Sequence, residues 1–80
     1  MIKYTPFFIN YDIAQSIPTN CNSILFINQG TTTAIVENIT IAPSQSFSID
    51  GNEMEYMEAT IQINFSGAGN NNLIVVKKVF

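Results

Sequence analysis

Hydrophobic and polar residues alternate most regularly between residues 56 and 66. One parity is apolar and comprises Met57, Ala59, Ile61, Ile63 and Phe65, whereas the other is polar apart from Tyr56. A period of two places successive side chains on opposite faces of a strand. The sequence therefore predicts a β-strand over this segment, with one face on a core and the other in water.

Two other segments are apolar without interruption, at residues 24–27 and 73–76. A strand with such a sequence is apolar on both faces, so both faces need to be covered. One face can lie on the domain's own core, but the other needs a second layer from the N-terminal segment or from a neighbouring molecule. We therefore expect an interface with a partner that involves Leu25, Ile27, Ile74 and Val76.

Shorter strands are predicted at residues 33–36, 39–41 and 46–49, because turn residues separate them. These turns are Gln29-Gly30, Glu37-Asn38, Pro43-Ser44 and Asp50-Gly51, and the glycine- and asparagine-rich residues 67–72 predict a further hairpin tip. No apolar stripe with helical spacing persists anywhere in the chain. We expect an all-β fold, a small antiparallel β-sandwich or partly open barrel of about five to seven short strands.

Residues 1–22 lack a clean strand period, since Pro6 and Pro18 interrupt them. The sequence predicts an extended N-terminal arm over residues 1–22, with at most one short strand, and a single sandwich domain over residues 23–80. The arm is expected to lie on another subunit through its aromatic residues Tyr4, Phe7, Phe8 and Tyr11. The alternative is that it folds back as one more strand of its own sheet.

Composition favours association over independent existence. A chain of 80 residues makes one domain and buries only roughly 60% of its unfolded surface, so it is close to the limit of independent stability. Its single cysteine excludes an internal disulfide. Charged residues make up 11% of the chain and the net charge is -3. Three lysines and no arginine cannot neutralise a run of phosphates, and no apolar run approaches the length of a membrane span, so we expect neither nucleic acid nor membrane as a partner.

The chain has little equipment for chemistry. It has no histidine, so Cys21 and the hydroxyl residues lack the usual activating base, and we expect neither an enzyme nor a bound cofactor. The acidic residues Asp50, Glu53, Glu55 and Glu58 have oxygen ligands for Ca²⁺ but do not match the spacing of a calcium loop, which favours a solvated turn and leaves metal binding open. Lys77 and Lys78 lie on opposite faces of the last strand, where charge commonly keeps a sheet edge from pairing; a salt bridge to a partner is the alternative.

Three segments together resemble a known class of protein. They are residues 28–33 (NQGTTT), 39–51 (ITIAPSQSFSIDG) and 71–80 (NNLIVVKKVF). An Asn-x-Gly-Thr hairpin, an apolar-x-Pro-x-x-Ser turn and a closing apolar strand make residues 22–80 similar to small β-rich virion proteins of tailed bacteriophages. Such patterns usually carry glycine after the proline, where this chain has Ser44. The resemblance implies a capsid-associated, neck or tail component of the virion that is assembled in the host cytoplasm.

These observations lead us to expect a non-enzymatic virion structural protein. It would be an auxiliary or decoration subunit whose partners are a larger major capsid, neck or tail protein and further copies of itself. Two alternatives stay open at this point. One is a small intracellular protein that binds and inhibits a host protein, and the other is a carbohydrate-binding module that stacks sugars on the N-terminal aromatic residues.

Overall fold

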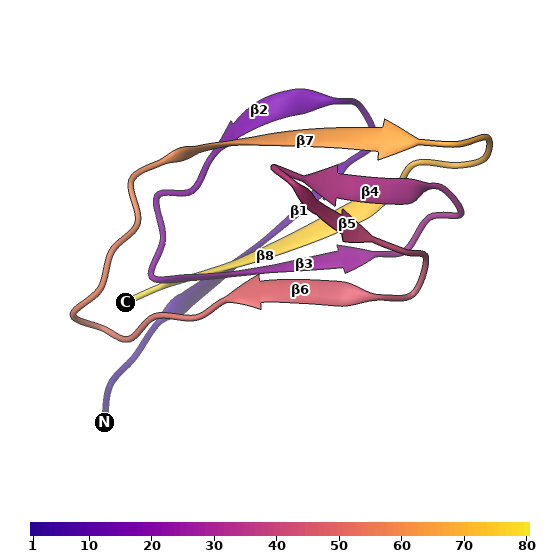
Figure 1. Ribbon diagram of the computed structural model, residues 1–80. Coiled ribbons are helices and arrows are strands. Elements are labelled where there is room, and N and C mark those ends of the chain that lie inside the picture. Colours follow the sequence, from indigo (N-terminus) through magenta and orange to yellow (C-terminus); the bar gives the residue numbers. More distant parts are fainter.

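A computed structural model of the chain describes residues 1–80 as eight strands without a helix (Figure 1). The strands are β1 (Thr5–Tyr11), β2 (Gln15–Pro18), β3 (Ser23–Asn28), β4 (Thr33–Val36), β5 (Ile39–Ile41), β6 (Ser46–Ile49), β7 (Thr60–Ser66) and β8 (Leu73–Val79). They form two four-stranded sheets, sheet A in the order β1-β8-β3-β6 and sheet B in the order β2-β7-β4-β5. The predicted all-β sandwich is confirmed, and it is open at its sides and not closed into a barrel.

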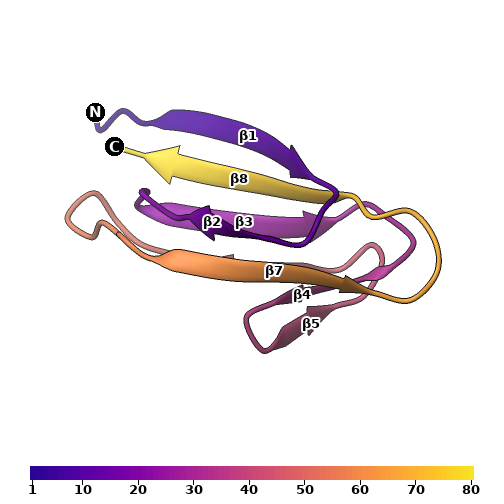
Figure 2. The same cartoon turned by 90° about the horizontal axis from the view of Figure 1, so that it is seen from above.

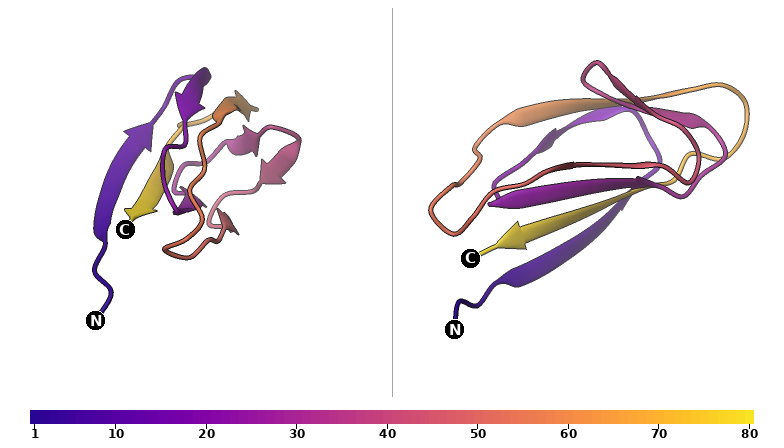
Figure 3. Two further views of the ribbon diagram at one scale, coloured as in Figure 1. Left: turned by 90° about the vertical axis from the view of Figure 1, so that its left-hand side faces the viewer. Right: turned by 60° about the horizontal axis from the view of Figure 1, so that its bottom comes forward.

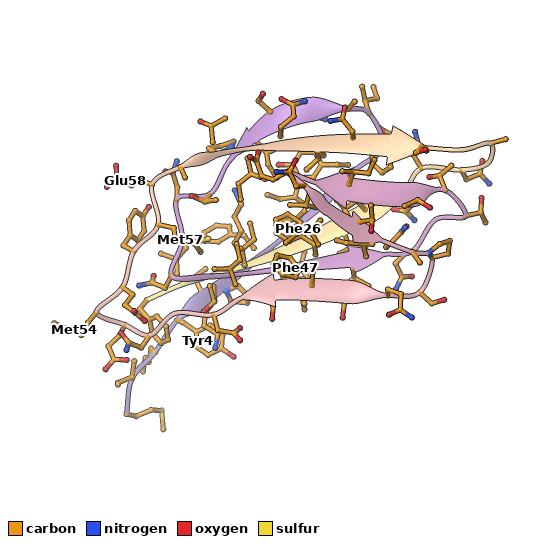
Figure 4. The ribbon with its side chains drawn as sticks, viewed as in Figure 1. Tyr4, Phe26, Phe47, Met54, Met57 and Glu58 are labelled. Atoms are coloured by element: carbon orange, nitrogen blue, oxygen red, sulfur yellow. The ribbon has the colours of Figure 1, made fainter.

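The two sheets pack face to face around one core (Figures 2 and 3). The buried residues come from both inner faces: Ile24, Phe26, Leu73 and Val75 of sheet A, Ile17, Ala34, Val36, Ile41, Ile61 and Ile63 of sheet B, and Cys21 from the β2–β3 connection. Phe26 is fully buried, and its ring stacks on that of Phe47 with centroids 6.4 Å apart (Figure 4). Full burial of one such side chain contributes about 1.5 to 3 kcal/mol.

The N-terminal segment differs from the expected extended arm. β1 pairs with β8 of the same chain, from Thr5↔Val79 to Tyr11↔Leu73, and β2 pairs with β7. The segment therefore folds back into its own domain, as the alternative held, and it forms two strands where at most one was expected. Its prolines are compatible with this position because β1 and β2 are edge strands, where an amide hydrogen need not be donated to a second neighbour.

The last strand also differs from the expectation, since β8 lies between β1 and β3 and is no edge. Its lysines therefore do not prevent edge pairing. Lys77 points inward and is only 8% exposed, and its Nζ donates a hydrogen bond to the carbonyl oxygen of Pro18 at 2.7 Å. Lys78 points outward, with Nζ 4.7 Å from the centroid of the Tyr4 ring. Burial of the lysine stem is tolerated because its ammonium group keeps a polar partner.

The most regular segment of the sequence forms β7, although the strand begins at Thr60 and not at residue 56. Its inward residues Ile61 and Ile63 are buried, as the alternation predicts. Ahead of the strand, Met57 makes only an isolated bridge with Cys21. Residues 57–59 nevertheless stay beside the β2–β3 connection, where the Thr19 amide donates a hydrogen bond to the carbonyl oxygen of Ala59 at 2.9 Å.

Buried asparagines hold the two ends of the sandwich. At one end the Asn28 side chain donates to the carbonyl oxygens of Thr32 and Ile41, both at 2.8 Å, and accepts a hydrogen bond from the Gly30 amide at 3.0 Å. At the other end Asn22 makes the equivalent three bonds, to the β6–β7 connection and to Phe80. Satisfied in this way, both asparagines serve the fold and are not free to bind a ligand.

Candidate interaction surface

The strand register defines the residues on the outer face of sheet A, which we call the outer A face. Directly paired residues of an antiparallel sheet point to the same side. Three rows cross the face from β1 through β8 and β3 towards β6: Phe8, Val76, Leu25 and Ser48; Asn10, Ile74, Ile27 and Ser46; and Pro6, Lys78 and Ser23. The middle of this face is therefore apolar, and β6 borders it with two serines.

The two apolar rows of the outer A face are open to solvent. Phe8 is 71% exposed, and the apolar residues of β3 and β8 on this side are only half-buried, because their cover is limited to neighbours within the sheet. Lys78 is the one charged residue in the three rows, and it lies at their end. The outer A face thus exposes apolar side chains to water, and its three rows contain no carboxylate.

The outer face of sheet B, the outer B face, has a different composition. Its residues are Ser16, Pro18, Thr33, Ile35, Thr40, Thr60, Gln62, Asn64 and Ser66. Most are polar and uncharged, and Ser16 donates a hydrogen bond to the Gln62 side chain at 2.7 Å. Ile35 is the single large aliphatic residue on the strands of this face. Such a surface is typical of a sheet that is solvated on one side.

The structure brings five of the eight predicted interface residues together. Phe8, Leu25, Ile27, Ile74 and Val76 all lie on the outer A face. Phe7 and Tyr11 lie on the opposite side of β1, where Phe7 is 47% exposed and Tyr11 packs against the core. Tyr4 precedes β1 and packs its ring edge-to-face on Phe80, at 5.7 Å and 65°. Sequence reasoning missed Ser46 and Ser48, because their parity becomes meaningful only once β6 is known to border this sheet.

Two grooves open at the sides of the sandwich. One, of about 570 Å³, lies between the edge strands β5 and β6 and is lined by Thr33, Ile39, Thr40, Ile41, Ala42, Gln45, Ser46 and Phe47. The other, of about 360 Å³, is lined by Lys3, Tyr4, Thr5, Phe7, Val79 and Phe80. Because the Tyr4 and Phe80 rings stand at 65° to each other, they do not form one flat platform on which a sugar ring could stack.

The side chains that could take part in a reaction or bind a metal ion do not form one site. Cys21 is buried, and this burial raises the pKa of its thiol, an effect that the nearby positive charge of Lys77 partly opposes. A buried thiol of raised pKa stays protonated at neutral pH and is a poor nucleophile.

The predicted carboxylate cluster is exposed in the β6–β7 connection: Asp50, Glu53, Glu55 and Glu58. There Glu55 accepts a hydrogen bond from the Asn52 amide at 3.1 Å. Nowhere in the chain are three or more histidine, cysteine or acidic side chains grouped so that they could hold a metal ion. The molecule also contains no helix long and apolar enough to cross a membrane.

The outer A face is consequently the most distinctive surface of the molecule. It is broad, open and apolar, whereas the carboxylates and the thiol are scattered or buried. Comparison of the chain with protein-family models, with curated proteins and with solved structures gives no match.

Proposed function

We propose that this chain is a non-enzymatic structural subunit that assembles with other proteins through the outer A face. The observation that carries the proposal is the half-buried row of Val76 and Leu25 beside the largely exposed Phe8. An exposed apolar patch of this kind is unfavourable in water and is typical of a surface that a partner covers. The low charge of the chain supports the same conclusion, because few like charges oppose close approach.

Within this class, we propose an auxiliary or decoration subunit of a virion that docks on a larger capsid or tail protein. The support is the similarity of residues 22–80 to small virion proteins of tailed bacteriophages. The stretch at residues 28–33 that contributes to this similarity serves to hold the fold, through the Asn28 hydrogen bonds. A stable fold with one apolar outer face is compatible with a subunit that functions by binding another protein.

Quantitative mass spectrometry of purified virus particles, prepared from cells that produce the chain in its natural setting, tests this proposal. We expect many copies of the chain per particle. A Leu25→Lys variant on the outer A face should be depleted from the particles at least tenfold, whereas an Ile35→Lys variant on the outer B face should be incorporated normally. If the chain is absent from particles and is recovered instead with one host protein, the virion role is excluded and the alternative of a protein that binds a host protein is favoured.

A further inference from the structure

We infer that the outer A face is covered by the same face of a second copy of this chain, in a two-fold dimer whose axis runs parallel to the strands. The inference rests on the proposed role of this face in assembly and names its occupant. Closed two-fold dimers, in which one patch meets an identical patch, are the commonest soluble assemblies. Such a pairing requires a surface that is complementary to itself.

The outer A face has the required gradient of side-chain size. Its β1 border carries the large ring of Phe8, and its β6 border carries the small side chains of Ser46 and Ser48. A two-fold axis in the interface and parallel to the strands keeps each row at its own height and reverses the order of the strands. Phe8 therefore faces Ser48 of the second copy, so that a bulky side chain meets a small one at both borders of the interface.

The rest of the rows match under the same operation. Val76 faces Leu25 of the second copy, and in the next row Ile74 faces Ile27. Asn10 faces Ser46, so the one amide within the apolar rows meets a hydroxyl group. In both complete rows, the apolar residues of β8 and β3 thus face each other, and the larger side chain of β1 faces the smaller one of β6.

Charge favours this arrangement as well. Lys78 faces Ser23 of the second copy and not another lysine. All six acidic residues lie outside the strands, in the connections, and none belongs to the three rows: Asp12, Glu37, Asp50, Glu53, Glu55 and Glu58. The rows that meet therefore contain no carboxylate, although each chain has a net charge of -3. Like charges placed directly opposite each other would have weakened the association of the two faces.

The area predicts a weak but specific dimer. The four strands of sheet A average six residues in length. With a spacing of about 4.8 Å between strands and roughly 3.3 Å per residue, they give a flat face of about 400 Å² per copy. With the relief of the side chains, the two copies bury on the order of 1,000 Å² in total, near the lower end of specific interfaces. Sheets that pack face to face also prefer strand directions within about 30° of each other, which this axis permits. We expect a dissociation constant on the order of 10 µM.

Sedimentation velocity of the purified full chain from about 1 to 200 µM, a range chosen to bracket that constant, tests the inference. The wild type should shift from monomer to dimer over this range. Ile27→Lys should raise the dissociation constant at least tenfold, and Ile35→Lys is its matched control. Both isoleucines are half-buried and point outward from an inner strand, one on each sheet. Circular dichroism establishes that each variant is folded.

A size exchange tests the orientation of the axis. Phe8→Ser should weaken the dimer by leaving a gap, and Ser48→Phe should weaken it by bringing two rings together. The double variant Phe8→Ser/Ser48→Phe should restore the affinity to within about threefold of the wild type, because it reverses the gradient without removing it. If the losses of dimer affinity in the two single variants simply add in the double variant, the proposed axis is wrong.

A wild type that stays monomeric at 200 µM, or a dimer that Ile35→Lys weakens as strongly as Ile27→Lys does, would overturn the inference as a whole. These results are separable from the particle assay. A monomer whose incorporation depends on Leu25 leaves the proposed function standing, with another protein on the outer A face. A dimer that is absent from particles leaves the dimer standing and excludes the virion role.

Discussion

The outer A face and the outer B face are both outward sides of four-stranded antiparallel sheets, and they differ in the residues that they expose to solvent. Every outward residue of β7 is polar, from Thr60 to Ser66. In contrast, β8 presents Ile74 and Val76 on its outward side, and β3 presents Leu25 and Ile27. A sheet of this size is therefore stable with a polar outer face, and the apolar residues of the outer A face need a different explanation.

The inner faces show that the core does not supply this explanation. Both sheets contribute fully buried residues to a single core, such as Phe26 from β3 and Ile63 from β7. The outward apolar side chains of β3, Leu25 and Ile27, are only half-buried. Their hydrophobicity exceeds what the folding of one chain requires, and covering them on assembly would recover the free energy that their exposure costs.

The largest expected effect is the difference in the free energy of unfolding between a substitution on the inner side of β3 and one on its outer side. Phe26→Ala removes a fully buried ring and should lower the free energy of unfolding by about 3 to 5 kcal/mol. Leu25→Ala, one residue away on the outer A face, should cost about 1 kcal/mol or less in the monomer, because its site is half open. Urea denaturation at 1 µM, about tenfold below the expected dimer constant, measures both values.

The concentration dependence of these two variants provides the control. At high protein concentration the wild type gains stability from association. The loss of unfolding free energy in Leu25→Ala, relative to the wild type, should therefore grow with concentration, while the loss in Phe26→Ala stays nearly constant. If Leu25→Ala costs as much as Phe26→Ala in dilute solution, Leu25 is packed within the single chain and the outer A face is not an open surface.

Sequence alone predicts much of this fold because the alternation of apolar residues is a local signal. The alternation in β7 and the uninterrupted runs of β3 and β8 identify the three longest strands that follow residue 22. The pairing of β1 with β8 was not predictable in the same way, since it joins residues far apart in the chain. The two prolines suggested an interruption, and only the edge position of β1 and β2 makes them compatible with strands.

The candidate surface was predictable in part for the same reason. The apolar runs of β3 and β8 indicate that Leu25 and Val76 need cover on their outward side. Which aromatic residue joins them depends on the β1 register, which selects Phe8 and places Phe7 on the other face. The serines of β6 carry no local signal, because a serine at a strand border is common wherever a strand is solvated.

A reciprocal exchange between the two outer faces should have the next largest effect. Val76→Asn on the outer A face loses contacts with Phe8 and Leu25 and should destabilise the monomer by about 1 kcal/mol. Asn64→Val on the outer B face gains a cross-strand contact with Ile35 and should stabilise the monomer by about 0.2 to 1 kcal/mol. Thermal denaturation of dilute samples measures both changes.

The same exchange separates stability from association. Val76→Asn should also weaken the dimer, whereas Asn64→Val should leave the dimer constant unchanged because the outer B face lies on the other side of the sandwich. Equal effects of both variants on association would contradict the assignment of the two faces.

A smaller effect is expected at the crossover between the sheets. Ser44 joins β5 of sheet B to β6 of sheet A and has a φ of 66°, in the left-handed region that favours glycine. Ser44→Gly should therefore stabilise the chain by about 0.5 kcal/mol, the relief of strain being partly offset by the greater freedom of glycine in the unfolded chain. Ser46→Gly, the same change two residues further on in β6, is the control and should destabilise by about 0.5 to 1 kcal/mol. Stabilisation by both variants would contradict this account.

The smallest effect concerns Cys21, which lies in the core that the two sheets share. Burial raises the pKa of its thiol, so the folded chain keeps the proton at pH values where the unfolded chain has lost it. This contribution to stability is fully present below the unfolded thiol's pKa of about 8.5 and is lost as the pH rises through the folded value. Because Lys77 partly opposes the shift, we expect the loss to be slight.

Comparison of the wild type with Cys21→Ala isolates this contribution, because the substitution removes the thiol and keeps every other ionisable residue in the chain. Alanine leaves a small void in the core, so the wild type should be the more stable protein at neutral pH. That advantage should narrow from about pH 8 to pH 10 as the unfolded thiol ionises. A difference in melting temperature that stays constant over this range would show that the thiol has the same pKa in the folded and unfolded chains. The interior between the sheets would then be more accessible to water than the complete burial of Cys21 indicates.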